Sequence, residues 1–154
     1  METEYVMRFD GCSKGNPGPS GAGAVIYKNN VEIWSAYDFV GTRTTNNVAE
    51  YHGLLLGLKN AISLGITSLK VEGDSLLVIK QMKGEYKVNI SHLTKLYEEA
   101  KNYEKQFQSI AYHHIYRTLN TRADELSNQA LEKIKINILI DDSYDLLIEK
   151  VKMD

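Results

Sequence analysis

The first forty residues contain three short runs that favour β-strands, separated by polar turns. Apolar, aromatic and β-branched residues gather in residues 4–10, 22–28 and 31–40, and segments of this length and composition are typical of strands. Asn29 and Asn30 separate the last two runs, and asparagine tolerates the positive φ angles that tight hairpins need. The pattern therefore predicts a three-stranded meander whose second turn is a tight hairpin.

The hydrophobic period changes after residue 45. Apolar side chains in residues 46–64 recur at helical spacing, which predicts a helix with one buried face. That face consists of Leu54, Leu55, Leu58, Ala61 and Ile62. Thr45 suits the N-cap of this helix, and Gly65 suits its end, because glycine readily adopts the left-handed conformation of the C′ position.

The remaining pattern alternates between strands and helices. We expect strands at 68–74 and 109–116 and helices at 75–82, 92–107 and 121–133. Thr121 and Asp124 have the spacing of a capping box at the start of the last helix. The order β-β-β-α-β-α-α-β-α predicts an α/β domain with a mixed sheet flanked by helices. Residues 1–133 would form this domain, and residues 134–154 a C-terminal extension with an apolar run and a candidate helix at 143–153.

The composition is that of an ordinary globular domain. A chain of 154 residues with 43% hydrophobic residues can bury a core of its own. The net charge of −2 shows no basic excess of the kind common in nucleic-acid-binding domains, but the acidic excess lies in residues 134–154, and charges in residues 1–133 balance. Cys12 is the only cysteine, which excludes an internal disulfide. No apolar run is long enough for a membrane span, so we expect a cytoplasmic protein without membrane contacts.

Four acidic residues stand where side chains of an α/β sheet converge. Asp10 ends the first predicted strand and Asp74 ends the fourth. Glu50 lies inside the first long helix, and Asp124 lies near the start of the last. Strand ends and helix starts meet at one edge of such a sheet, and carboxylates suit Mg²⁺ or Mn²⁺. A single aspartate at a strand end or helix start is usually a cap or a turn residue, whereas Glu50 interrupts a run of small and apolar residues. Spacing by itself therefore leaves both interpretations open.

Four ordered segments surround these acids. They are Asp10-Gly-Cys-Ser-Lys-Gly-Asn-Pro-Gly-Pro-Ser-Gly-Ala-Gly23, Thr44-Thr-Asn-Asn-Val-Ala-Glu50-Tyr, Glu72-Gly-Asp74-Ser75 and Asn120-Thr-Arg-Ala-Asp124-Glu-Leu-Ser-Asn. Together they resemble the motifs of the type 1 ribonuclease H family over residues 4–133. The resemblance implies a ribonuclease H-like fold with a five-stranded mixed β-sheet flanked by α-helices. It also implies an endoribonuclease that hydrolyses the RNA strand of RNA·DNA hybrids and leaves 5′-phosphate and 3′-hydroxyl ends.

The same resemblance implies two Mg²⁺ or Mn²⁺ ions per active site when substrate is bound. Asp10 would bridge both ions, Glu50 and Asp74 would bind one, and Asp124 would bind the other. The residues implied in substrate binding are Gly11, Cys12, Ser13, Asn16, Arg43, Thr45, Asn46, Asn47 and Asn89.

Individual substrate contacts follow from the same comparison of motifs. Asn46 and Asn47 match a pair that reads the minor groove of the hybrid, where the 2′-hydroxyl distinguishes RNA from DNA. Ordinary chemistry at a helix N-terminus is the alternative for both. Arg43, Thr45 and Asn89 resemble a pocket for a phosphate of the DNA strand.

Two features depart from the family pattern. The loop at 117–123 lacks the histidine that many members carry, and we take Arg117 as a candidate partial substitute. Residues 74–92 lack the basic insertion with which some members grip the hybrid. Both departures resemble an archaeal and bacterial subgroup, and the second predicts weak, salt-sensitive binding of nucleic acid.

Two rival functions remain at this stage. Another nuclease of the same superfold, such as a transposase-type enzyme or a 3′→5′ exonuclease, would share the clustered acids but would not need Asn46 and Asn47. A non-catalytic binding module would be marked by loss of a carboxylate, and all four are present. Double-stranded RNA is a further candidate substrate, since it also displays 2′-hydroxyls in its minor groove. We expect the protein to be a monomer.

Overall fold

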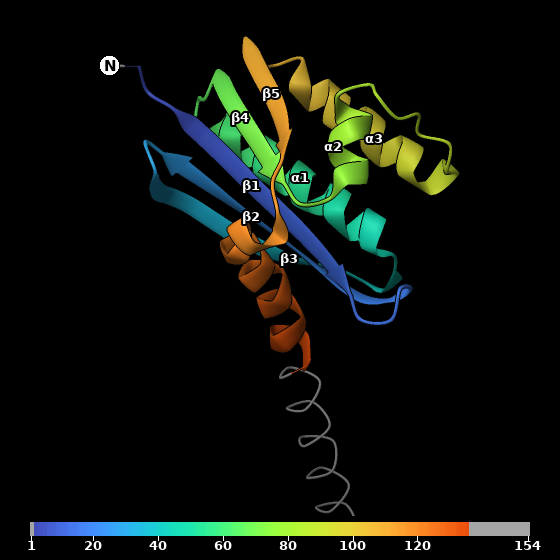
Figure 1. Cartoon of the computed structure of the whole chain (residues 1–154). Helices are drawn as coiled ribbons and strands as arrows, with labels where there is room; N and C mark the ends of the chain where they lie inside the picture. Colours follow the sequence, from blue (N-terminus) through green and yellow to red (C-terminus); the bar gives the residue numbers. More distant parts are fainter. Residues whose placement is uncertain (1, 136–154) are drawn as a thin grey trace, which may run out of the picture.

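The computed structural model describes residues 2–135 and builds one five-stranded sheet with helices on both faces (Figure 1). The strands are β1 (Tyr5–Ser13), β2 (Gly18–Lys28), β3 (Val31–Thr44), β4 (Ser68–Gly73) and β5 (Ser109–His114). Their order across the sheet is β3-β2-β1-β4-β5. The first three pair antiparallel, whereas β4 runs parallel to both β1 and β5. The predicted mixed sheet is confirmed.

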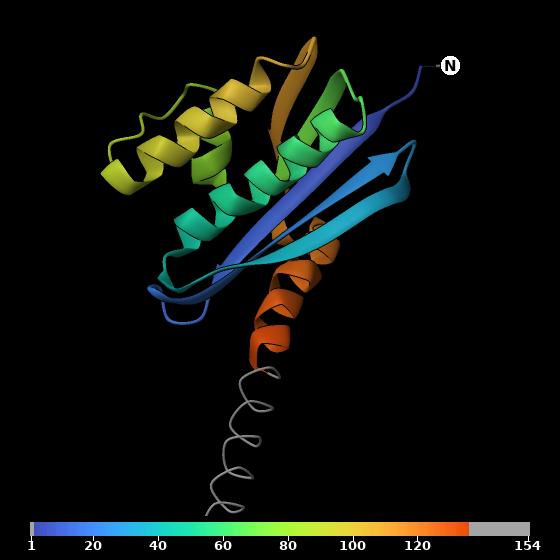
Figure 2. The same cartoon turned by 180° about the vertical axis from the view of Figure 1, so that it is seen from behind.

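The helices form two layers around this sheet. They are α1 (Asn46–Ser63), α2 (Leu76–Met82), α3 (Ser91–Glu104), a short 3₁₀ turn η1 (Arg117–Leu119) and a last helix that is described over residues 121–135. Figures 1 and 2 show α1, α2 and α3 on one face of the sheet and helix 121–135 on the other. The main core lies between the sheet and the layer formed by α1, α2 and α3, where Phe9, Tyr51 and Leu54 are fully buried.

Local sequence signals set the ends of several elements as predicted. Asn29 and Asn30 have φ angles of 49° and 69° in the turn between β2 and β3. Thr45 caps α1, because its side-chain oxygen accepts a hydrogen bond from the backbone N–H of Val48 at 3.3 Å. Gly65 has a φ of 77° just past the end of the helix, in the left-handed region that glycine favours.

The first three strands are longer than predicted. We expected the first strand to end at residue 10, but β1 continues to Ser13, and β2 begins four residues earlier than expected. The reason is pairing between strands: each residue from Gly11 to Ser13 has a partner in β2, down to Ser13 opposite Ser20. Asp10 therefore lies inside a strand, not at its end. Most of the glycine-rich motif at residues 10–23 is therefore part of this antiparallel pair.

The start of the last helix also differs from the prediction. The carbonyl of Asn120 accepts the first intrahelical bond, from the N–H of Asp124 at 3.1 Å, so Asn120 and not Thr121 is the N-cap. The predicted capping box is wrong. The candidate helix at 143–153 lies outside the described residues.

Candidate metal centre

Asp10 and Glu50 meet because β1 and α1 approach each other unusually closely. A Cβ atom at Gly11 would overlap the backbone of Ala49, and one at Gly53 would lie 2.5 Å from the carbonyl oxygen of Asp10. Only glycine permits contacts of this kind at both positions. The close crossing brings the side chain of Glu50 against that of Asp10, and both are buried, with exposed fractions of 8% and 5%.

Asp74 joins this pair through the parallel pairing of β1 with β4. Phe9 is the register partner of Gly73, so the residues that follow them, Asp10 and Asp74, come to lie side by side. Oxygen atoms of Asp10, Glu50 and Asp74 all lie within 4.8 Å of one another. Three carboxylates at this separation can share a cation, since hard divalent ions take oxygen ligands.

The electrostatics of this cluster are unfavourable without a cation. Burial raises the pKa of Asp10 to about 7, and the negative charges of Asp74 and Asp124 act in the same direction. Burial also raises the pKa of Glu50 well above its ordinary value, and the charge of Asp10 adds to this. Among the described residues, the buried Oε2 of Glu50 has no hydrogen-bond partner. An unpartnered buried oxygen in a group of three carboxylates fits a divalent ion, which would reduce the repulsion between the charges and could also coordinate that oxygen.

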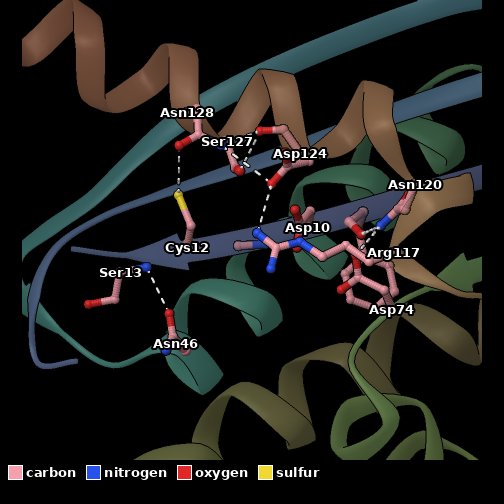
Figure 3. Close-up of polar contacts among 12 residues, drawn as sticks. Asp10, Cys12, Ser13, Asn46, Asp74, Arg117, Asn120, Asp124, Ser127 and Asn128 are labelled. Atoms are coloured by element: carbon pink, nitrogen blue, oxygen red, sulfur yellow. Dashed lines mark hydrogen bonds and ion pairs between the residues drawn. The ribbon is translucent and has the colours of Figure 1, made fainter. Parts of the chain in front are cut away.

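Asp124 lies next to this cluster but is not part of it. Over residues 2–135, the group of acids that could hold one ion comprises Asp10, Glu50 and Asp74. The carboxylate of Asp124 instead contacts Arg117 at 3.8 Å and the side-chain nitrogen of Asn128 at 3.4 Å (Figure 3). Because its charge raises the pKa of Asp10, Asp124 is still close enough to interact with the cluster.

A polar network joins the hairpin between β1 and β2 to the start of α1. The backbone N–H of Ser13 donates to the side-chain oxygen of Asn46 at 2.8 Å (Figure 3), and the N–H of Asn46 donates to the side-chain oxygen of Asn16 at 2.9 Å. Both amide oxygens are thus used within the protein. The Nδ2 group of each exposed asparagine remains as a donor for an external acceptor.

The other predicted substrate residues occupy different surroundings. Arg43 and Asn89 are exposed, at the end of β3 and between α2 and α3, and Asn47 is half-buried in the first turn of α1. Gly11 is buried, and its N–H donates to Oδ1 of Asp10 at 2.9 Å. The thiol of Cys12 is half-buried, 3.9 Å from the side-chain oxygen of Asn128.

Asn120 is a site residue to which our sequence analysis assigned no role. It is 1% exposed, and its amide donates to Oδ2 of Asp74 at 3.2 Å. The only signal in the sequence is an asparagine four residues before Asp124, at a position where helix capping is the ordinary interpretation.

Within the described part of the chain, no helix is long and apolar enough to cross a membrane.

Comparison with known proteins identifies the class of domain. The family model described as "Reverse transcriptase-like" matches residues 8–130. The N-terminal RNase H domain of a Mycobacterium tuberculosis protein, solved as a fusion with maltose-binding protein, superposes with a TM-score of 0.83 at 41% identity and covers 89% of this chain and 99% of that chain. The RNase H1 of Halobacterium salinarum superposes with a TM-score of 0.81 at 34% identity, covering 84% and 98%. The fold is that of a ribonuclease H-like domain.

Sequence relatives define the family more narrowly. Ribonuclease HI of Halobacterium salinarum is 38% identical over 125 residues, which cover 80% of this chain and 62% of that protein. Ribonuclease H of a Sulfurovum species is 30% identical over 147 residues, covering 88% and 95%. The chain belongs to the type 1 ribonuclease H family. It is also 44% identical to a bifunctional protein of Mycobacterium tuberculosis, of which it spans only 36%.

Proposed function

We propose that this protein is an endoribonuclease that hydrolyses the RNA strand of RNA·DNA hybrids, with residues 1–133 as its catalytic domain. The observation that carries the proposal is the buried cluster of Asp10, Glu50 and Asp74, whose oxygens lie within 4.8 Å of one another. Such a cluster is costly for the fold unless a cation binds it. A related enzyme with 32% sequence identity, LC11-RNase H1, has been solved in complex with an RNA/DNA hybrid, which supports the choice of substrate.

The carboxylates divide into two groups for metal binding. Asp10, Glu50 and Asp74 would hold one Mg²⁺ or Mn²⁺ ion. Asp124, whose charge acts on Asp10, would hold a second ion together with Asp10. When bound, such ions supply an activated water and stabilise the leaving oxygen. In this hydrolysis the oxygen of water would bond to the phosphorus, the bond from phosphorus to the 3′-oxygen would break, and a proton lost by the water would be replaced by one taken up at the 3′-oxygen. The products would carry a 5′-phosphate and a 3′-hydroxyl.

Recognition of the RNA strand would use the polar network at the start of α1. The oxygens of Asn16 and Asn46 are held by backbone N–H groups, so their Nδ2 groups are oriented as donors toward a 2′-hydroxyl or phosphate oxygen. Asn47 would contribute a further amide, and the segment Gly11, Cys12 and Ser13 would lie beside the strand. Double-stranded RNA presents the same 2′-hydroxyls and is a second candidate substrate.

The DNA strand would be held by its phosphates. Arg43 supplies a positive charge at the exposed end of β3, and Thr45 and Asn89 supply hydroxyl and amide donors. Phosphate contacts fix the register of a duplex without reading its sequence. We propose that a monomer carries all of these groups.

The test is cleavage of a hybrid with one strand labelled at a time. Wild-type protein with Mg²⁺ or Mn²⁺ should cut the RNA strand and leave the DNA strand intact, while Asp10→Asn should lose nearly all turnover because an amide cannot balance the charge of two ions. Glu98→Gln removes an exposed carboxylate of α3 and is the matched control. Binding of the hybrid without cleavage, under either metal, would favour a non-catalytic module.

A further inference from the structure

Asn120 sits at the N-cap of helix 121–135 but does not use its side chain as an N-cap residue does. An asparagine at this position ordinarily accepts a hydrogen bond from a backbone N–H of the first helical turn through its side-chain oxygen. Among the described residues, Oδ1 of Asn120 is instead buried with no hydrogen-bond partner. An unpartnered buried oxygen is unfavourable for stability, so capping does not explain this residue.

The amide nitrogen of Asn120 is fully engaged (Figure 3). Nδ2 donates to the backbone carbonyl of Phe9 at 2.9 Å and to Oδ2 of Asp74 at 3.2 Å. Both partners are acceptors, so the orientation of the amide is determined: the reversed amide would set its oxygen against two other oxygens. The side chain of Asn120 is therefore bonded to Phe9 of β1 and to Asp74, and not to the first turn of its own helix.

These two bonds connect the three parts of the chain that carry Asp10, Asp74 and Asp124. Phe9 immediately precedes Asp10 in β1, Asp74 follows β4, and Asn120 begins the helix that carries Asp124. Since Nδ2 bonds to Oδ2 of Asp74, the other carboxylate oxygen is left out of this contact. One amide group thus sets the rotation of Asp74 and ties the start of the last helix to β1.

We propose that Asn120 is a positioning residue that orients the carboxylate of Asp74 for metal binding. The inference rests on the proposed function, because it needs the carboxylates to be metal ligands. Mutation of a residue that hydrogen-bonds to a metal ligand typically lowers the metal affinity by about 10- to 100-fold. Asn120 is buried, so its substitution should weaken the binding of the metal and leave the binding of the hybrid unchanged.

The experiment is calorimetric titration of the metal-free protein with Mn²⁺, without nucleic acid. Asn120→Leu keeps most of the volume and removes the donor, and its Kd for Mn²⁺ should rise about 10-fold or more. Asn120→Ser is a smaller change that retains a hydroxyl donor, and it should give an intermediate Kd. Gln81→Leu is the control: it removes another buried amide, which accepts from the hydroxyl of Tyr51 at 2.5 Å, and it should lower stability without changing the Kd.

Kinetics supply a second measurement. The kcat of Asn120→Ser should fall at low Mg²⁺ and recover at saturating Mg²⁺, with the KM for the hybrid unchanged. An unchanged Mn²⁺ affinity in the folded Asn120 variants, or an equal loss in Gln81→Leu, would overturn the positioning role. If Asn120→Leu does not fold, Asn120→Ser decides between these outcomes. Failure of the wild-type protein to bind Mn²⁺ would instead refute the metal centre itself.

Discussion

Replacing Asp10 by asparagine should stabilise the metal-free protein at neutral and alkaline pH. Burial raises the pKa of Asp10 from its ordinary 3.8 to about 7, so the folded protein resists ionisation of this group. One pKa unit corresponds to about 1.4 kcal/mol, and the difference therefore amounts to about 4 kcal/mol of folding free energy. The amide of Asp10→Asn carries no charge, and its oxygen can still accept from the N–H of Gly11, as Oδ1 does now at 2.9 Å.

The sign of the effect fixes its pH dependence. Below pH 3.8 the carboxyl is protonated in both states, and the substitution relieves no charge. Between pH 3.8 and about 7 the unfolded chain loses its proton first, so the folded state binds more protons and the wild type loses stability as pH rises. The advantage of the variant should therefore grow through this window and level off above it.

Urea denaturation with a chelator at pH 4.5 and pH 8 measures this difference. We expect Asp10→Asn to exceed the wild type by about 2–4 kcal/mol at pH 8 and by much less at pH 4.5. Glu98→Gln, an exposed carboxylate of α3, should shift neither value. A gain of equal size at both pH values, or a loss at pH 8, would refute the electrostatic reasoning. Saturating Mn²⁺ should raise the stability of the wild type and narrow the difference.

Three further predictions concern the site and its supports. Metal affinity should rise with pH across the neutral range, because Asp10 and Glu50 must lose their protons to bind an ion; a titration giving the same Kd at pH 6 and pH 8 would contradict this. Gly53→Ala should cost about 1–3 kcal/mol in urea denaturation, since its methyl group would lie 2.5 Å from the carbonyl oxygen of Asp10; unchanged stability and activity would show that α1 can move away freely. Arg117→Ala should lower kcat about 10-fold or more, since its guanidinium lies 3.8 Å from Asp124, and a fall no larger than that of Lys105→Ala, an exposed control, would remove Arg117 from the mechanism.

Several parts of the fold could be predicted because they depend on neighbouring residues alone. The threonine cap at residue 45, the left-handed glycine at residue 65 and the hairpin at Asn29 and Asn30 each follow from the conformational preferences of one or two side chains. The hydrophobic period of α1 is likewise local, since residues three and four apart share a helix face. These signals sufficed for the order of the elements.

The lengths of the first strands could not be predicted in this way. Gly11, Cys12 and Ser13 have no strong strand propensity, and they belong to β1 because residues of β2 pair with them. Pairing between strands is a property of the sheet and not of the segment. For the same reason, the position of Asp10 inside a strand was visible only in the structure.

The sequence by itself predicted four acids as candidates for the site, through four motifs in a fixed order. The tertiary structure decided how these acids are arranged: Asp10, Glu50 and Asp74 form one cluster, while Asp124 lies beside it against Arg117. In the folded domain, the side chain of Asn120 also donates a hydrogen bond to Asp74 and does not cap its own helix. Distances between residues more than forty positions apart depend on how closely strands and helices pack. Close contacts such as that of Gly53 with β1 form only when the whole domain is assembled, so the sequence of one segment does not reveal them.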